Sequence, residues 1–487
     1  MPDIKPQETL KAASRSVKWA TIAEIVSKAT TPVLYLILAS ILSPNDFGVI
    51  SASFILINFS QVIWDAGFGK SLIQTDLPVE KVANPVFWLN FIFSLLIYAF
   101  VFLFSPQISA FLNVPEAAKV LPVLGIQIIF QSLVSVPQAV MVREFEFKSI
   151  LVAKLSNSLI PIIIAIPLAL LNFGVWALVA GYVSGSILNT VVYWKVSKWR
   201  PSFTIDWKYL NYIKRFGFWS FVEGLSSWFF SWGDNFIVGK FLGAYFLGVY
   251  TIGWNVVSMV FGLVINPLVQ IIYSTFSRIK HDSELIRVTY HKVLGYILFI
   301  TFPIALLFFT LSSLLIPAWV SDKWQNIIIV IKVIGLLYGC SSLVSINPEL
   351  YRALGLPDLN AKLMIAFIAI YLPVYLLVIS FGFESFLYAR LILGALTLPV
   401  HFIIVRKVIT FNWNNFFRNY LWLFAGLVEM IFLVVLLKQL FAYFLILDLY
   451  KGIIIIIIAL AIFVLNTQIF RPHFIGELIK SLGLKNV

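Results

Sequence analysis

The sequence is poor in charge and has almost no cysteine. Only 12% of its 487 residues are charged, against about a quarter in an ordinary soluble domain, and 61% are hydrophobic. Cys340 is the one cysteine, so no disulfide can form within the chain. A soluble core could not bury this much apolar surface. Most of the chain must therefore be surrounded by lipid.

Motifs for covalent chemistry are also lacking. The sequence contains no HExxH, no GxxxxGK[ST] and no cluster of His or Cys, and the segments between its apolar runs are short. An integral membrane enzyme, such as a polysaccharide polymerase or a glycosyltransferase, usually needs paired acids or a metal site in a sizeable water-facing loop. We therefore expect a transporter that is not an enzyme, has no metal site or other cofactor, and does not hydrolyse ATP.

Apolar runs of roughly 20 residues, the length that crosses a bilayer as a helix, recur along the chain. They predict an all-α integral membrane protein with fourteen transmembrane helices. The expected limits are 18–42, 47–66, 83–105, 118–141, 150–171, 173–194, 216–239, 246–269, 292–316, 326–350, 362–381, 384–408, 419–438 and 450–470.

The net charge of +13 is distributed unevenly between the loops. If the N-terminus is cytoplasmic, most of the 35 Lys and Arg residues fall on the inner side. This bias predicts cytoplasmic N- and C-termini and contact with anionic membrane lipids, with no nucleic acid as a partner. The outer segments then hold only Lys119, Lys240, Lys323, Lys438 and Lys451.

One phrase occurs twice, 200 positions apart. ILSPNDFGVISAS begins at residue 41 and FLGAYFLGVYTIG at residue 241, with Gly48 matching Gly248. Both glycines are expected to allow close helix approach. Six spans separate the two copies, so both copies have the same orientation, as in transporters built from parallel repeats. We therefore expect two six-helix lobes, 1–200 and 201–408, around a central cavity, with spans thirteen and fourteen and a cytoplasmic tail in 409–487.

Several segments resemble one family. They read VREFEFKS from residue 142, DNFIVGKFLGAYFLGVYTIG from 234, INPLVQIIYSTFSRIKHD from 265, SDKWQNIIIVIKVIGL from 321 and LYRALGLPDLN from 350. In this order they resemble the Wzx-type polysaccharide exporters, the polysaccharide transporter branch of the MOP flippase superfamily.

The resemblance implies a flippase in the plasma (inner) membrane of a prokaryote. It would move undecaprenyl-pyrophosphate-linked oligosaccharide to the outer leaflet for lipopolysaccharide, capsule or exopolysaccharide synthesis. We also expect transport by alternating access, coupled to H⁺ or Na⁺. The polysaccharide polymerase machinery is the expected protein partner. The alternative is a multidrug or small-cation antiporter of the same superfamily, which would more often have twelve spans. A membrane polymerase is less favoured.

Four cations lie within the expected spans and are our candidates for binding the pyrophosphate. A charge at the centre of a span costs roughly 2.5–3.5 kcal/mol, so it usually faces protein or water. The alternatives are that Lys28 pairs with Glu24, that Lys154 and Lys332 extend to the membrane surface, and that Arg390 pairs with Glu384. The substrate-binding candidates are Lys28, Lys154, Lys332 and Arg390.

Three acids within the spans are candidates for ion coupling. Glu24 and Glu223 occupy nearly equivalent depths in spans one and seven, and burial would let either carboxyl carry a proton near neutral pH. Glu429 lies in span thirteen, outside the lobes, where an assembly role competes with coupling. Asp234 is expected to be a helix-end partner of Lys240.

Overall fold

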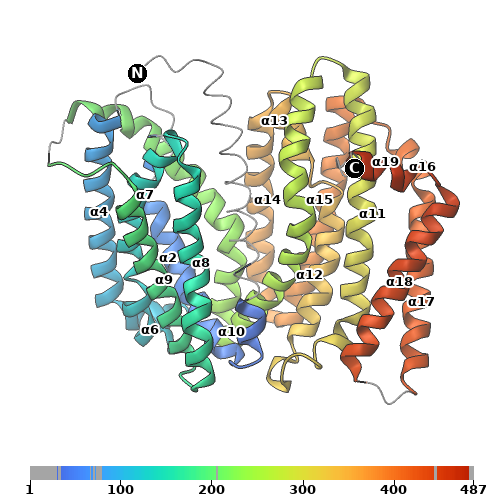
Figure 1. The fold of residues 1–487 in the computed structure, drawn as a ribbon, viewed down its shortest axis with the longest axis horizontal. Helices are drawn as coiled ribbons and strands as arrows, with labels where there is room; N and C mark the ends of the chain where they lie inside the picture. Colours follow the sequence, from blue (N-terminus) through green and yellow to red (C-terminus); the bar gives the residue numbers. More distant parts are fainter. Residues whose placement is uncertain are drawn as a thin grey trace. The chain divides into compact units, whose positions relative to one another are not determined.

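The computed structural model describes residues 30, 34–65, 67–69, 72, 79–203, 207–443 and 447–481, and these are helical apart from turns and connections (Figure 1). Glu24 and Lys28 lie outside the described residues. The α-helices are α2 (Pro44–Asp65), α4 (Val79–Leu103), α5 (Ser105–Phe111), α6 (Ala117–Leu124), α7 (Gln127–Arg143), α8 (Phe147–Leu170), α9 (Val175–Val196), α10 (Trp207–Ile279), α11 (Ser283–Leu315), α12 (Ile327–Ser342), α13 (Asn347–Ala353), α14 (Pro357–Val378), α15 (Phe383–Ile409), α16 (Trp413–Asn419), α17 (Leu421–Phe441), α18 (Asp448–Phe470) and α19 (Phe474–Ser481).

Twelve helical segments in the described residues are long and apolar enough to cross a membrane. One of them, Ser220–Ile279, covers both the seventh and the eighth expected spans, and the helix kinks at Gly243 (φ 79°). Most of the first expected span lies outside the described residues. The chain is thus an all-helical, multi-pass membrane protein with about 12 to 14 spans, and the count of fourteen stays a prediction.

By its internal contacts the chain divides into two compact units, Met1–Ile252 and Gly253–Val487. In the first unit, α8 packs along α9 and α4 packs along α7, while α2 contacts α4, α6, α7 and α9 (Figure 1). The interior is aromatic as well as aliphatic, because Phe47, Trp64 and Tyr193 are almost completely buried.

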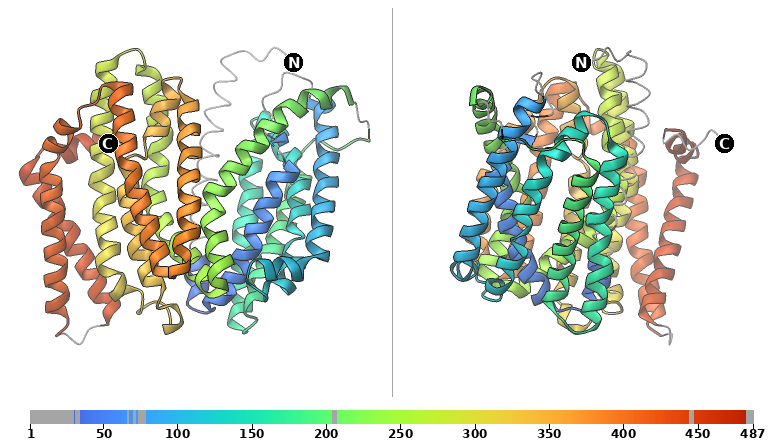
Figure 2. Two further views of the ribbon diagram at one scale, coloured as in Figure 1. Left: turned by 180° about the vertical axis from the view of Figure 1, so that it is seen from behind. Right: turned by 60° about the vertical axis from the view of Figure 1, so that its left-hand side comes forward.

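In the second unit, α12 packs between α11 and α15, and α14 lies against α15. The last two long helices, α17 and α18, pair with each other and both contact α11 at the edge of this unit (Figure 2). Tyr420, just before α17, anchors them: its hydroxyl donates to the backbone oxygen of His291 on α11 at 3.2 Å. The ring of Phe474 on α19 lies 5.2 Å from the ring of Trp422.

The sequence explains where α2 begins. Ser43 donates from its backbone N–H and its hydroxyl to Oδ2 of Asp46, at 2.9 and 2.6 Å, and Pro44 occupies the first helical position. This is a capping box, in which the N-cap side chain and the side chain three residues later satisfy each other's backbone groups. The corresponding turn of the second copy contains Gly243.

Candidate functional site

The two copies of the repeated phrase lie against each other within the first unit. A methyl group placed on Gly48 would lie 1.8 Å from the carbonyl oxygen of Ala244, and one on Gly248 would lie 1.9 Å from the carbonyl oxygen of Pro44. Both helices can therefore meet backbone to backbone only where neither carries a side chain. The close approach expected at these glycines is present, and its partner is the other copy of the phrase.

The turn before Gly248 is held by a cation. The Nζ of Lys240 donates to the backbone oxygen of Phe111 at 2.5 Å and lies 4.1 Å from the centre of the Phe111 ring. Phe111 is the last residue of α5, where a helix has unsatisfied carbonyl groups and favours positive charge. Lys240 thus ties the second copy of the repeat to α5.

A buried polar network lies on the same helix. Asp234 is 7% exposed and accepts a hydrogen bond from the Tyr250 hydroxyl at 2.5 Å, across the Gly243 kink. Asn235 donates to Asp234 from its backbone N–H at 2.9 Å and accepts from Thr251 at 3.1 Å. The spacing of 16 residues is shared by both pairs, 234 with 250 and 235 with 251. Sequence reasoning missed this network, although a mid-span Asp was the visible signal.

Arg390 on α15 is the candidate cation with the most defined surroundings. Its side chain is half-buried, and its guanidinium carbon lies 4.5 Å from the ring centre of Trp254 on α10. Tyr338 of α12 flanks that ring at 5.3 Å, and Tyr371 of α14 is close enough to interact with the Arg390 charge. A guanidinium stacked by its face on a ring can still bind an anion through its N–H edge.

Lys332 on α12 also lies in the second unit. It is half-buried, and its charge interacts with that of Lys438 on α17. Lys438 is held at the end of α11, where its Nζ donates to Ser313 Oγ at 3.0 Å.

Lys154 lies in the first unit, about two turns into α8, and is half-buried. Its backbone oxygen accepts from Ser158 Oγ at 3.0 Å. The described candidates therefore divide between the units: Lys154 belongs to the first, and Lys332 and Arg390 belong to the second. Within the second unit, Lys332 and Arg390 come from adjacent, packed helices, α12 and α15.

Two of the acids proposed for coupling lie in the described residues, and both are exposed. Glu223 is exposed on α10, and its role in ion coupling stays a prediction. Glu429 is exposed on α17 and accepts a hydrogen bond from Asn466 Nδ2 of α18 at 2.5 Å.

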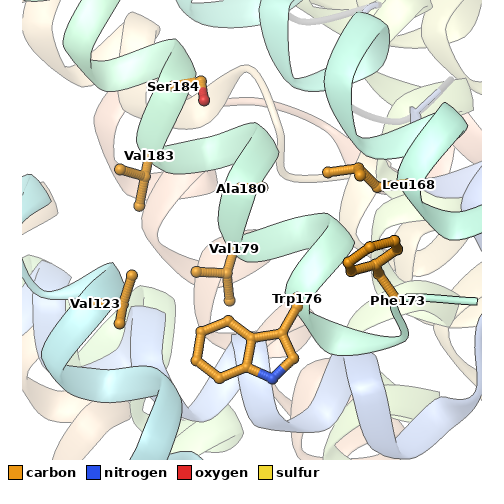
Figure 3. Close-up of a pocket in the computed structure, with 8 residues that line it drawn as sticks. All are labelled: Val123, Leu168, Phe173, Trp176, Val179, Ala180, Val183 and Ser184. Carbon is orange, nitrogen blue, oxygen red and sulfur yellow. The ribbon is translucent and has the colours of Figure 1, made fainter.

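A cavity of about 300 Å³ opens at the α8–α9 turn of the first unit (Figure 3). Trp176 and Phe173 lie at one end and Val183 with Ser184 at the other, with Leu168 of α8 opposite. Its lining carries no charge, so it is suited to an apolar chain and not to a pyrophosphate.

The sequence comparison decides the family. A model described as "Polysaccharide biosynthesis protein" matches residues 37–329, more than half of the chain. The chain belongs to this family. The resemblance drawn from the sequence is thereby confirmed at the level of the family.

Named relatives are distant. The succinoglycan biosynthesis transport protein ExoT of Rhizobium meliloti is 25% identical over 57% of this chain and 56% of its own length. The lipopolysaccharide biosynthesis protein WzxC of Escherichia coli is 25% identical, with 66% of each chain covered. The teichuronic acid biosynthesis protein TuaB of Bacillus subtilis is 22% identical, with 72% and 73% covered. The match thus spans between about half and three quarters of these relatives.

Solved structures show the fold. The lipid II flippase MurJ, in an inward closed conformation, superposes with a TM-score of 0.74 at 18% identity, over 94% of this chain and 99% of that one. An inward-facing MATE family multidrug transporter of the MOP superfamily gives 0.64 at 14% identity, over 81% and 98%. The chain therefore has the same fold as these two transporters.

Proposed function

We propose that the chain flips undecaprenyl-pyrophosphate-linked oligosaccharide from the cytoplasmic to the outer leaflet of a prokaryotic plasma membrane. The product would feed the synthesis of lipopolysaccharide, capsule or exopolysaccharide by a polymerase machinery. Family membership supports this proposal, as do the names of three relatives, which refer to succinoglycan, lipopolysaccharide and teichuronic acid biosynthesis. Transport would proceed by alternating access of the two repeats, coupled to H⁺ or Na⁺, with both termini cytoplasmic.

The observation that carries the proposal is the position of Arg390. A cation in the hydrophobic part of a membrane protein is retained where it has a function or a partner. Arg390 is half-buried, and its guanidinium carbon lies 4.5 Å from the centre of the Trp254 ring, a cation–π contact that restricts the side chain. A guanidinium restricted in this way suits the paired oxygens of a phosphate, because two parallel N–H groups can bind them together. Lys154 and Lys332 are the further candidates for contact with the anion during passage, and Lys28 stays a prediction.

A multidrug antiporter is the second candidate, because the fold is shared with a MATE family transporter. Such a protein would carry organic cations, for which a stacked arginine is a repelling group. The charge of Arg390 therefore favours the anionic substrate over the cationic one.

The test uses protein in proteoliposomes with a fluorescent undecaprenyl-pyrophosphate oligosaccharide. We expect Arg390→Ala to lower the flipping rate at least about tenfold, because a charge-assisted hydrogen bond contributes roughly 1.5–3 kcal/mol. Arg390→Lys should restore part of the rate, since it keeps the charge but loses the paired donors. Trp254→Leu should also lower the flipping rate, but by less than Arg390→Ala, because it removes the ring against Arg390 and keeps the charge.

Arg406→Ala is the matched control, because Arg406 lies on the same helix and is exposed near its end. Equal effects of the Arg390 and Arg406 substitutions would remove Arg390 from the binding site. Full activity of both variants would have the same consequence.

A further inference from the structure

The surface of α17 and α18 carries a polar pair within an apolar face. Glu429 lies eight residues into α17, about 12 Å along its axis, and Asn466 lies opposite it on α18. Val428 and Phe432 beside Glu429 are 67% and 71% exposed, and Ile469 beside Asn466 is 73% exposed. In a membrane-spanning chain, an exposed apolar face of this kind is turned to lipid or to another protein.

The hydrogen bond between Glu429 and Asn466 uses only part of what the two side chains offer. Asn466 donates one N–H to one carboxyl oxygen of Glu429. An amide has a second N–H and an acceptor oxygen, and a carboxyl group has a second oxygen. Hydrocarbon chains can satisfy none of these groups, and Glu429 is too short to reach the membrane surface from this depth.

We propose that this face is the contact between two copies of the chain in the membrane. A two-fold axis along the membrane normal brings each residue to its counterpart at the same depth. The Glu429–Asn466 pair contains both donors and acceptors, so it is complementary to its own image. The exposed Val428, Phe432 and Ile469 then surround the polar contact and exclude lipid from it.

A second copy fits better than a different membrane protein. A different partner would have to present its own polar group at the same depth, and nothing in this chain specifies such a partner. Two-fold symmetry supplies the matching group without further requirements. The inference concerns assembly alone, and it does not depend on which substrate the protein moves.

Cross-linking tests the geometry of the contact. In a Cys340→Ser background, Phe432→Cys should form a disulfide-linked dimer in lipid vesicles under oxidation. The control is Leu377→Cys on α14, because Leu377 is 69% exposed and lies on a different helix of the same unit. We expect efficient dimer formation at position 432 and little at position 377. Equal cross-linking at both positions, or none at position 432, would overturn the proposal.

Substitution of the polar pair tests its energetic role. Single-molecule photobleaching at a series of protein-to-lipid ratios measures the dimer fraction. Glu429→Leu should weaken the dimer about 3- to 30-fold, the range expected for one interhelical hydrogen bond in a membrane. Glu429→Gln should keep the dimer, because it retains an acceptor oxygen and adds donors.

Glu429→Leu combined with Asn466→Leu leaves neither polar group in the face and should insert at least as well as the original chain. Elution of this double variant as a monodisperse peak in detergent confirms folding. A dimer that survives the double substitution, or a chain that is monomeric at every ratio, would refute the proposed contact. Cross-links from position 432 to an unrelated membrane protein in native membranes, with none to a second copy, would do so as well.

Discussion

Alanine at Gly48 or Gly248 should push the two copies of the repeated phrase apart. The new methyl group would lie 1.8 Å from the oxygen of Ala244 in the first case and 1.9 Å from the oxygen of Pro44 in the second. An optimal contact between non-bonded carbon atoms is about 3.5–4.0 Å, so either methyl group stands at about half of the usual separation. The opposing atom is backbone and cannot rotate away, so a helix must move.

The size of the effect follows from two opposing contributions. Overpacking of a close contact costs typically 1–3 kcal/mol, and contact with a backbone atom places this case at about 3 kcal/mol. Replacing glycine by alanine within a helix stabilises the folded state by roughly 0.5–1 kcal/mol, because alanine has the higher helix propensity. The net loss of about 2 kcal/mol corresponds to a fall in the unfolding temperature of about 4–8 °C for a unit of this size.

Thermal unfolding of purified protein in detergent measures this loss. Gly233→Ala is the matched control, because its methyl group would meet only Phe229 Cδ1, at 3.8 Å on the same helix. The double variant Gly48→Ala/Gly248→Ala should lose less than the sum of the single losses, since the first methyl group already opens the crossing. Equal stability of the Gly48 and Gly233 variants, or strict additivity, would refute the backbone contact.

Two further losses of stability should follow from removing hydrogen bonds in the first unit. Tyr250→Phe removes the donor to buried Asp234 and should lower the free energy of unfolding by about 1–3 kcal/mol, measured by the same thermal assay; an unchanged stability would mean that the network is not formed. Ser43→Ala breaks the capping box at the start of α2 and should cost about 0.5–2 kcal/mol, whereas Ser43→Thr keeps the hydroxyl donor and should restore most of the loss if capping is the cause.

The spans were predictable because lipid imposes a simple rule on the sequence. Every long stretch surrounded by hydrocarbon must be helical and apolar, so length and hydropathy are enough to find it. The same rule does not show how helices join. The expected spans 216–239 and 246–269 are two helical stretches that meet at Gly243, where the non-helical backbone (φ 79°, ψ −172°) separates them without an intervening loop.

The repeat was visible in the sequence, but its meaning was only partly readable. The matched positions of Gly48 and Gly248 predicted close helix approach, which is local information. In the structure, each glycine faces the backbone of the other copy. This contact depends on tertiary packing, which the sequence of one copy alone does not reveal.

The candidate site shows a similar division. Hydropathy identified Arg390 as a cation within a span, but its stacking on Trp254, 136 positions earlier, depends on how α10 and α15 pack. For Asp234 the nearest cation in sequence was the expected partner, whereas the structure gives it the hydroxyl of Tyr250. Lys240 was the expected partner of Asp234 because of its charge, but its ammonium group binds the backbone oxygen of Phe111 at the end of α5.

The measurement that tests the central claim most directly is the movement of lipid-linked sugar across a sealed bilayer. Proteoliposomes containing fluorescent undecaprenyl-pyrophosphate oligosaccharide would be treated with a quencher that cannot cross the membrane, with protein-free vesicles as the reference. We expect the protein to make nearly all of the label accessible to the quencher, at a rate that falls when Arg390 is replaced. Label that stays protected as in protein-free vesicles, together with gradient-driven uptake of a small organic cation, would contradict this expectation.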